Sequence, residues 1–150
     1  MGDIVQPTRP EQIEQVRALF REYEAWVAEP CCFAGFEREL AELPKEYRVL
    51  LLAEVGGAPA GCVGLRALPD GAAEMKRLYV RPAYQGRGLG RRLAGEIIAA
   101  ARASGHAALR LDTLPKMVPA IALYRALGFL PRGPYAAAPT PGALFFELRL

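Results

Sequence analysis

Three glycines at alternate positions, Gly86, Gly88 and Gly90, lie between an apolar, strand-like run and a helix-like run of the 150-residue chain. Glycine adopts positive φ angles easily and lets the main chain approach a ligand closely. The start of a helix adds unpaired N–H groups and the positive end of the helix dipole. Positive side chains stand among and after the glycines, namely Arg87, Arg91 and Arg92. The pattern predicts an anion site, most naturally for a phosphate group.

This glycine-rich segment has plainer interpretations as well. The glycines could merely shape a turn, and the arginines could form a solvated helix face. Among phosphate ligands, a nucleoside triphosphate is disfavoured because no Gly-Lys-Ser/Thr ends the loop. A dinucleotide is disfavoured because the glycines depart from the Gly-x-Gly-x-x-Gly spacing.

Composition limits the class of protein. With 52% hydrophobic and 23% charged residues, we expect one globular domain over residues 1–150. A formal charge of +3 is small, so we expect no nucleic-acid partner. Cys31, Cys32 and Cys62 lack CxxC spacing and the lone His106 completes no zinc set, so we expect free thiols and no metal. The sequence shows no secretory signal or membrane-spanning run, which predicts a cytoplasmic location and no membrane partner.

Hydrophobic periodicity and turn signals divide the chain into strands and helices. A first helix is expected between Thr8, as N-cap of a capping box with Glu11, and Pro30. Further helices are expected at Phe36–Leu43, Arg87–Ser104 and Pro119–Leu127. Strands are expected at Asp3–Gln6, Tyr47–Val55, Pro59–Leu68, Ala73–Val80, Ala107–Thr113, Phe129–Arg132 and Ala143–Leu150. Antiparallel hairpins followed by a β-α-β-α-β run indicate an α+β fold with a mixed sheet.

Three motifs in this order resemble the GNAT family of N-acetyltransferases. Residues 85–90, Gln-Gly-Arg-Gly-Leu-Gly, resemble its Gln/Arg-x-x-Gly-x-Gly/Ala signature. The preceding Leu78-Tyr-Val-Arg-Pro82 and the later Ala120-Ile-Ala-Leu-Tyr-Arg-Ala-Leu-Gly-Phe129 are also typical of the family. The resemblance implies a mixed, mostly antiparallel sheet of about seven strands, with about four helices packed on both faces.

The same resemblance implies that acetyl-CoA is the donor. The backbone of Leu78, Tyr79 and Val80 would pair with the pantetheine amides, beside a gap between two splayed strands. The pyrophosphate would be held by the loop, that is by Gln85, Gly86, Arg87, Gly88, Leu89, Gly90 and Arg91. Thr113 and Met117 are expected to contact the coenzyme on that flank, although Met117 stands where family members often carry an asparagine.

Two residues are candidates for the catalytic proton transfers. Glu74 stands where some family members place their catalytic glutamate, and it is the expected base; alternatively it pairs with Arg66 or Lys76. Tyr124 is the expected acid toward the thiolate, or else a packed core tyrosine. A phenol of pKa ~10 protonates a thiolate of pKa ~8.5 only at a cost of about 2 kcal/mol, which favours hydrogen bonding over full transfer.

The acceptor site is expected between the first two helices and the last loop. Its candidate residues are Tyr23, Trp26, Phe33, Arg38, Arg66 and Tyr135. Arg38 could hold a substrate carboxylate, or could be an ordinary solvated helix residue. The aromatic residues could equally belong to the core.

These observations predict an N-acetyltransferase that moves an acetyl group from acetyl-CoA to a primary amine of a small, amino-acid-like molecule by direct attack. The alternatives are acetylation of a protein or peptide amine, and a non-catalytic acyl-CoA sensor. A homodimer is a further expectation, with the apolar segment 143–146 as its contact.

Overall fold

The computed structural model describes residues 2–136 and 139–150. In chain order the elements are β1 (Gly2–Val5), α1 (Pro10–Val27), the 3-10 helix η1 (Pro30–Phe33), α2 (Phe36–Ala41), β2 (Val49–Val55), β3 (Ala58–Ala67), β4 (Ala73–Val80), the 3-10 helix η2 (Pro82–Tyr84), α3 (Leu89–Ala103), β5 (Ala108–Thr113), α4 (Val118–Ala126), β6 (Leu130–Arg132) and β7 (Leu144–Arg149). No helix within these residues is long and apolar enough to cross a membrane.

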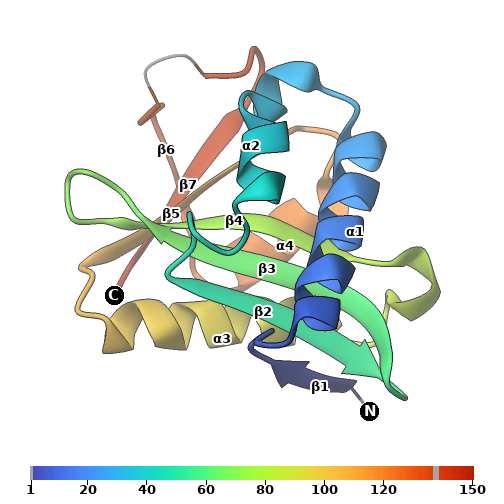
Figure 1. The fold of residues 1–150 in the computed structure, drawn as a ribbon. Coiled ribbons are helices and arrows are strands. Elements are labelled where there is room, and N and C mark those ends of the chain that lie inside the picture. The colour runs from blue at the N-terminus through green and yellow to red at the C-terminus, as the bar shows by residue number, and fades with distance from the viewer. Residues whose placement is uncertain (1, 137–138) are drawn as a thin grey trace.

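The described strands form one seven-stranded sheet in the order β1-β2-β3-β4-β5-β7-β6. Every neighbouring pair is antiparallel except β4 and β5, which run parallel. Helices α1 and α2 lie against one face of the sheet, and α3 and α4 lie against the other (Figure 1). The predicted α+β fold, with a mixed and mostly antiparallel sheet, is confirmed.

A hydrophobic core lies on each face of the sheet. Under α1 and α2 the buried side chains include Leu19, Phe20 and Leu40, and under α3 and α4 they include Leu93 and Ile97. Apolar residues recurring at helical spacing therefore mark the faces that pack on the sheet.

The apolar segment 143–146 is used inside the molecule. Phe145 and Phe146 are almost fully buried, because other side chains cover them: Tyr124 of α4 packs on Phe146 and Tyr135 packs on Phe145. Only Leu144 of the β7 residues in this segment is substantially exposed. The expectation that this segment forms a dimer contact is therefore corrected, since its two phenylalanines pack in the core.

Three helix starts differ from the sequence prediction; α4 begins one residue early, at Val118 rather than Pro119. Helix α1 begins one residue later than expected, with Arg9 rather than Thr8 as N-cap. The Gln12 side-chain oxygen, and not Glu11, accepts the backbone N–H groups of Thr8 and Arg9, at 3.0 and 3.1 Å. Helix α3 begins at Leu89 rather than Arg87, because the preceding Gly88 has a left-handed backbone.

Candidate active site

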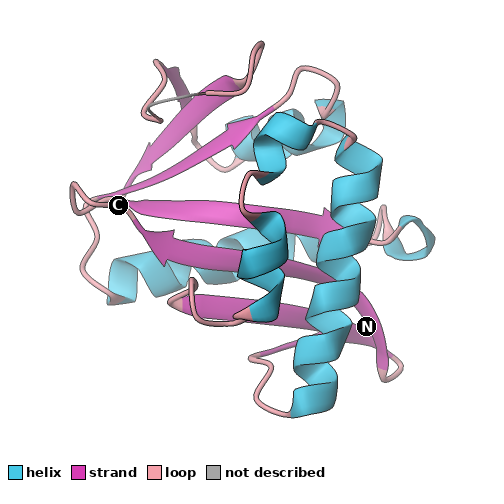
Figure 2. Ribbon diagram, turned by 45° about the horizontal axis from the view of Figure 1, so that its top comes forward, coloured by secondary structure: helices cyan, strands magenta, loops and turns pink. Residues whose placement is uncertain are grey.

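The two central parallel strands, β4 and β5, separate soon after they meet. They pair only at Ala73 with Leu109 and at Glu74 with Arg110, and beyond that point they diverge (Figure 2). The carboxyl ends of parallel strands that part in this way leave a crevice in the sheet. A cavity fills this crevice, and its lining includes Tyr23, Cys32, Lys76, Leu78, Asp112, Thr113, Met117 and Tyr124.

Strand β4 carries a bulge at the edge of this cavity. Its register with β3 shifts between Cys62–Tyr79 and Gly64–Lys76, and Arg77 there adopts a left-handed backbone with φ of 60°. Such a conformation costs a non-glycine residue roughly 1–2 kcal/mol. A bulge re-aims the strand beside a site.

The Arg77 side chain fixes the bulge through a buried ion pair. Its guanidinium lies 2.8 Å from Glu39 on α2 and 4.5 Å from the centre of the Phe33 ring. Tyr47 donates a 2.5 Å hydrogen bond to the same carboxylate. Burial raises the pKa of Glu39, but the hydrogen bonds and charge of its partners outweigh it and leave the pKa lowered. Arg77 is thus committed to Glu39.

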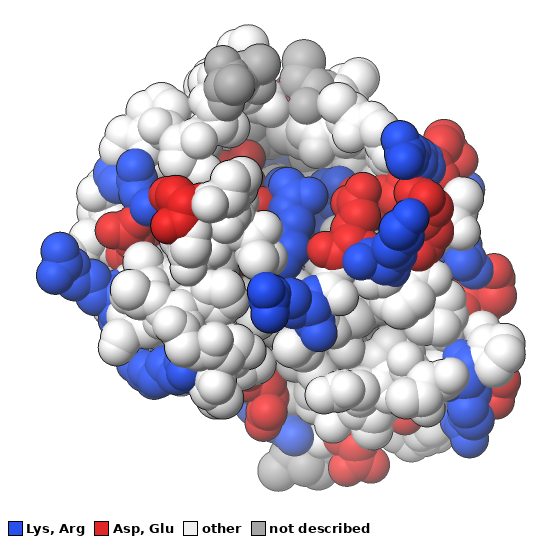
Figure 3. Space-filling view, turned by 60° about the vertical axis from the view of Figure 1, so that its left-hand side comes forward, with Lys and Arg blue, Asp and Glu red and all other residues white. Residues whose placement is uncertain are grey.

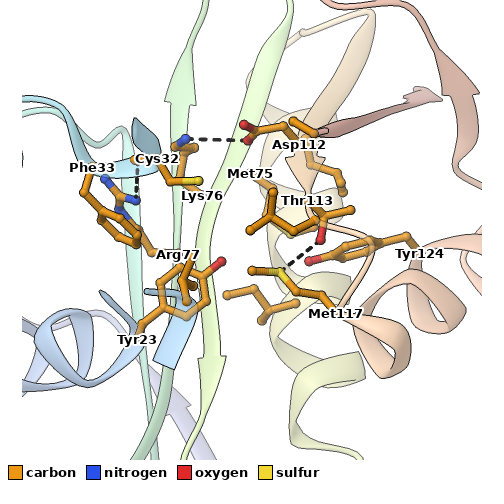
Figure 4. Close-up of a pocket in the computed structure, with 15 residues that line it drawn as sticks. Tyr23, Cys32, Phe33, Met75, Lys76, Arg77, Asp112, Thr113, Met117 and Tyr124 are labelled. Atoms are coloured by element: carbon orange, nitrogen blue, oxygen red, sulfur yellow. Dashed lines mark hydrogen bonds and ion pairs between the residues drawn. The ribbon is translucent and has the colours of Figure 1, made fainter. Parts of the chain in front are cut away.

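Tyr124 reaches the cavity from α4. Its ring is buried against Phe129 and Phe146, and its hydroxyl points into the cavity, toward that of Tyr23 (Figure 4). Burial raises the pKa of Tyr124, so the phenol stays protonated near neutral pH. The expected acid is therefore both a packed tyrosine and a hydrogen-bond donor that faces the crevice.

Lys76 of β4 and Asp112 of β5 face each other across the gap between the strands (Figure 4). Their charged groups are 3.7 Å apart, and both line the cavity. This ion pair is the one contact between charged groups that either side chain makes among the described residues. Asp112 therefore keeps its acceptor positions open to a ligand.

Glu74, the expected base, lies at the closed end of the crevice and does not line the cavity. Arg66 and Tyr135 hold its carboxylate, at 2.7 and 2.5 Å. Burial raises the pKa of Glu74, but Lys76, Tyr135 and Arg66 outweigh it and lower the pKa. A carboxylate with its oxygens bonded and its pKa lowered is a poor proton acceptor, so the geometry disfavours Glu74 as the base.

A second groove leads away from the crevice along β4 to the glycine-rich loop. It encloses about 400 Å³, and its lining includes Leu78, Val80, Gln85, Gly86, Gly88, Leu89 and Gly90. Gly86 and Gly88 have left-handed backbones with φ of 78° and 80°. The N–H groups of residues 86–91 have no hydrogen-bond partner among the described residues, since the first helical bond of α3 runs from Arg92 to Gly88. Unpaired N–H groups at a helix start suit an anion.

The basic side chains near this loop do not all face it. Arg92 donates a 2.6 Å hydrogen bond to the Gly2 carbonyl and so fastens β1. Arg87 lies over the Tyr84 ring at 5.6 Å, while Arg91 is exposed on α3. The Gln85 side chain donates to the Val80 carbonyl at 2.9 Å and holds the loop against β4.

The remaining predicted residues lie at different places around the crevice. Tyr23 and Trp26 line the passage between cavity and groove, which also includes Tyr79. Thr113 donates to the Met117 sulfur at 3.1 Å inside the cavity. Arg38 is mostly exposed and pairs with Glu42 at 3.0 Å, which agrees with the alternative that it is a solvated helix residue. Tyr135 holds Glu74 and packs on Phe145.

A sheet that opens between two parallel strands, with unpaired main-chain N–H groups at the end of the opening, has the shape and chemistry for an extended phosphorylated ligand. A sequence model of the Acetyltransferase (GNAT) family matches residues 13–129, and the chain belongs to this family.

Individual relatives support the assignment. An uncharacterised N-acetyltransferase of Schizosaccharomyces pombe is 32% identical over 94% of this chain and 90% of its own length. The IAA acetyltransferase of Azospirillum brasilense is 39% identical over 73% of this chain and 72% of its own length. The PaiA N-acetyltransferase of Thermoplasma acidophilum, solved with coenzyme A, has a TM-score of 0.80 at 18% identity, over 100% of this chain and 99% of its own. The likeness to this solved structure concerns the fold. The family match and the relatives named above make the protein an acetyl-CoA-dependent N-acetyltransferase.

The residues present fit the coenzyme. The free N–H groups of residues 86–91 suit its pyrophosphate, and the groove along β4 continues into the cavity at Leu78.

Asp112 was not singled out as a site residue from the sequence. The available signal was a lone acid near the carboxyl end of the strand expected to splay from residues 73–80. No spacing rule shows that the gap opens just before it.

Proposed function

We propose that the protein acetylates a primary amine of a small molecule, with Asp112 as the base and Tyr124 as the hydrogen-bond donor to the leaving sulfur. One observation carries the proposal: a carboxylate whose ion-pair partner among the described residues is Lys76, and a protonated phenol, open onto the same cavity, from β5 and from α4. A base and a hydrogen-bond donor that face one cavity suit acyl transfer to an amine.

Each residue has a defined task in this proposal. Acetyl-CoA supplies the acetyl group as a reactive thioester. The Asp112 carboxylate accepts the proton that the amine nitrogen must lose as it bonds to the acyl carbon. The Tyr124 hydroxyl donates a hydrogen bond to the sulfur as its bond to that carbon breaks. Because burial raises the pKa of Tyr124, it acts through this hydrogen bond rather than by giving up its proton.

The acceptor side of the cavity supports a small substrate over a protein. Tyr135 reaches across to Glu74, and Thr140 lies 3.4 Å from the Cys32 sulfur, so the segment after β6 contacts both β4 and η1. A peptide chain would need an open channel at this position, whereas a small amine needs only the cavity.

A panel of small amines and short peptides, with acetyl-CoA as donor and free thiol as the readout, tests the proposal. We expect thiol release with small amines and initial-rate lines that intersect, because parallel lines indicate a covalent enzyme intermediate. Binding of acetyl-CoA without thiol release from any amine would instead support the acyl-CoA sensor. Faster turnover of peptides than of small amines would support a protein substrate.

Matched variants separate the two candidate bases. Asp112→Asn should lower kcat/KM by about 10²- to 10⁴-fold, the usual contribution of a general base. Glu74→Gln has the same change of charge one strand away, and we expect a much smaller loss of activity. A loss at Glu74→Gln equal to or larger than that at Asp112→Asn would return the base assignment to Glu74.

A further inference from the structure

A charged opening leads from the surface into the crevice on the side of α2. Its lining includes Arg38, Glu39, Glu42, Arg66, Lys76 and Arg77, and it shares Lys76 and Arg77 with the central cavity. Positive and negative side chains lie side by side around a hollow in the space-filling view (Figure 3). We call this opening the acceptor vestibule.

The arginines of the acceptor vestibule are already paired. Arg38 lies 3.0 Å from Glu42 and Arg66 lies 2.7 Å from Glu74, both within hydrogen-bond range. Arg77 is held by Glu39 in the buried pair that fixes the bulge. A guanidinium group that is already paired with a carboxylate interacts only weakly with the charge of a ligand.

Lys76 differs from these arginines. Its ammonium carries three hydrogen-bond donors, and its contact with Asp112 at 3.7 Å is too long for a hydrogen bond. Its one ion-pair partner among the described residues is Asp112, at 3.7 Å. Its side chain is only 15% exposed, so water screens its charge less than that of a surface lysine. It stands where the acceptor vestibule meets the cavity.

We infer that Lys76 binds a carboxylate of the acceptor, and that the acceptor is an amino acid or a related amine with a carboxylate beside the reacting nitrogen. This inference rests on the proposed function. The neighbouring charges of Lys76 and Asp112 match the charge pair of such a molecule, with its carboxylate at Lys76 and its amine at Asp112. Lys76 can keep its contact with Asp112, because one ammonium can donate to two carboxylates.

This arrangement also assists the loss of the proton. A carboxylate next to an ammonium group favours the protonated, unreactive form of the amine. Pairing that carboxylate with Lys76 offsets the effect and makes the proton easier for Asp112 to accept. Lys76 is therefore a specificity-determining residue with a secondary effect on the reactivity of the amine.

The test compares amino acids with their carboxamides, which keep the amine and lose the negative charge. The ratio of kcat/KM for each acid to that for its amide is measured in the wild type and in Lys76→Met, so that the intrinsic reactivity of each amine cancels. We expect the wild type to prefer the acid and Lys76→Met to lower the ratio about 10- to 100-fold. Lys45→Met is the matched control within the acceptor vestibule: Lys45 also lines it, but its side chain is 72% exposed and pairs with Glu42.

The outcomes distinguish the inference from the function on which it rests. An unchanged ratio in Lys76→Met, with coenzyme A binding intact by calorimetry, overturns the role of Lys76 while acetyl transfer stands. Equal effects of Lys76→Met and Lys45→Met also overturn it, since they indicate a general effect of positive charge in the acceptor vestibule rather than binding at Lys76. If no amine in the panel causes thiol release, the proposed function is overturned, and this inference with it.

Discussion

The glycine-rich loop makes a sharp prediction, because two of its glycines differ in conformation. Gly88 has φ of 80° and ψ of 7°, and an added Cβ would meet nothing within 4 Å. Gly88→Ala therefore meets no clash, and its cost is the left-handed backbone alone, about 1–2 kcal/mol of unfolding free energy. For a chain of this length, that lowers Tm by roughly 2–8 °C.

Gly90→Ala is the matched control. Gly90 lies in the first turn of α3, and its added methyl would contact Leu123 and Val80 at 3.8 and 3.9 Å, which are ordinary packing distances. Alanine favours a helix over glycine by up to about 1 kcal/mol, so this variant should be as stable as the wild type or more so. The family signature also accepts alanine at this position.

Coenzyme A affinity should separate the two variants in the same way. The methyl of Gly88→Ala stands in the groove beside the free N–H groups, or else the loop leaves the conformation that aligns them. Losing a charge-assisted hydrogen bond to phosphate weakens binding about 10- to 100-fold. We expect that loss for Gly88→Ala with coenzyme A by calorimetry, a near-normal value for Gly90→Ala, and little change for either with pantetheine, which lacks the pyrophosphate. Wild-type affinity in a folded Gly88→Ala, or equal losses in both variants, would refute the main-chain cradle.

Three further predictions concern the crevice and its support. Tyr124→Phe should lower kcat about 10- to 100-fold with coenzyme A affinity nearly unchanged, since the hydroxyl is proposed to act on the leaving sulfur; an unchanged kcat in steady-state assays would remove it from the mechanism. Arg77→Met should reduce the free energy of unfolding by about 3–5 kcal/mol in urea titrations, because it leaves Glu39 buried without its partner; a loss below about 1 kcal/mol would show that the pair does not hold the bulge. The lowered pKa of Glu39 contributes stability that is complete above its ordinary pKa of about 4.5 and is lost as the pH falls through the folded-state pKa. Wild-type protein should therefore lose more stability between pH 7 and pH 3 than Glu39→Gln, and parallel losses would contradict this.

The local order of the chain could be read largely from its sequence. Apolar residues at spacings of 3 and 4 predicted the buried face of α1, because a helix places such residues on one side. The alternate glycines and the helix after them predicted the anion loop, because positive φ and unpaired N–H groups are properties of neighbouring residues. Helix starts were less well predicted, since Gln12 and Glu11 compete for the same capping position.

The catalytic side chains could not be settled in that way. The sequence offers Glu74, Asp112 and several other acids, and nothing local distinguishes them. The tertiary structure places Glu74 where β4 and β5 still pair, so Arg66 and Tyr135 occupy its oxygens, while Asp112 lies beyond the point where the strands part. Burial and partners from distant segments determine which carboxylate is available to a substrate, and both arise only when the strands and helices come together.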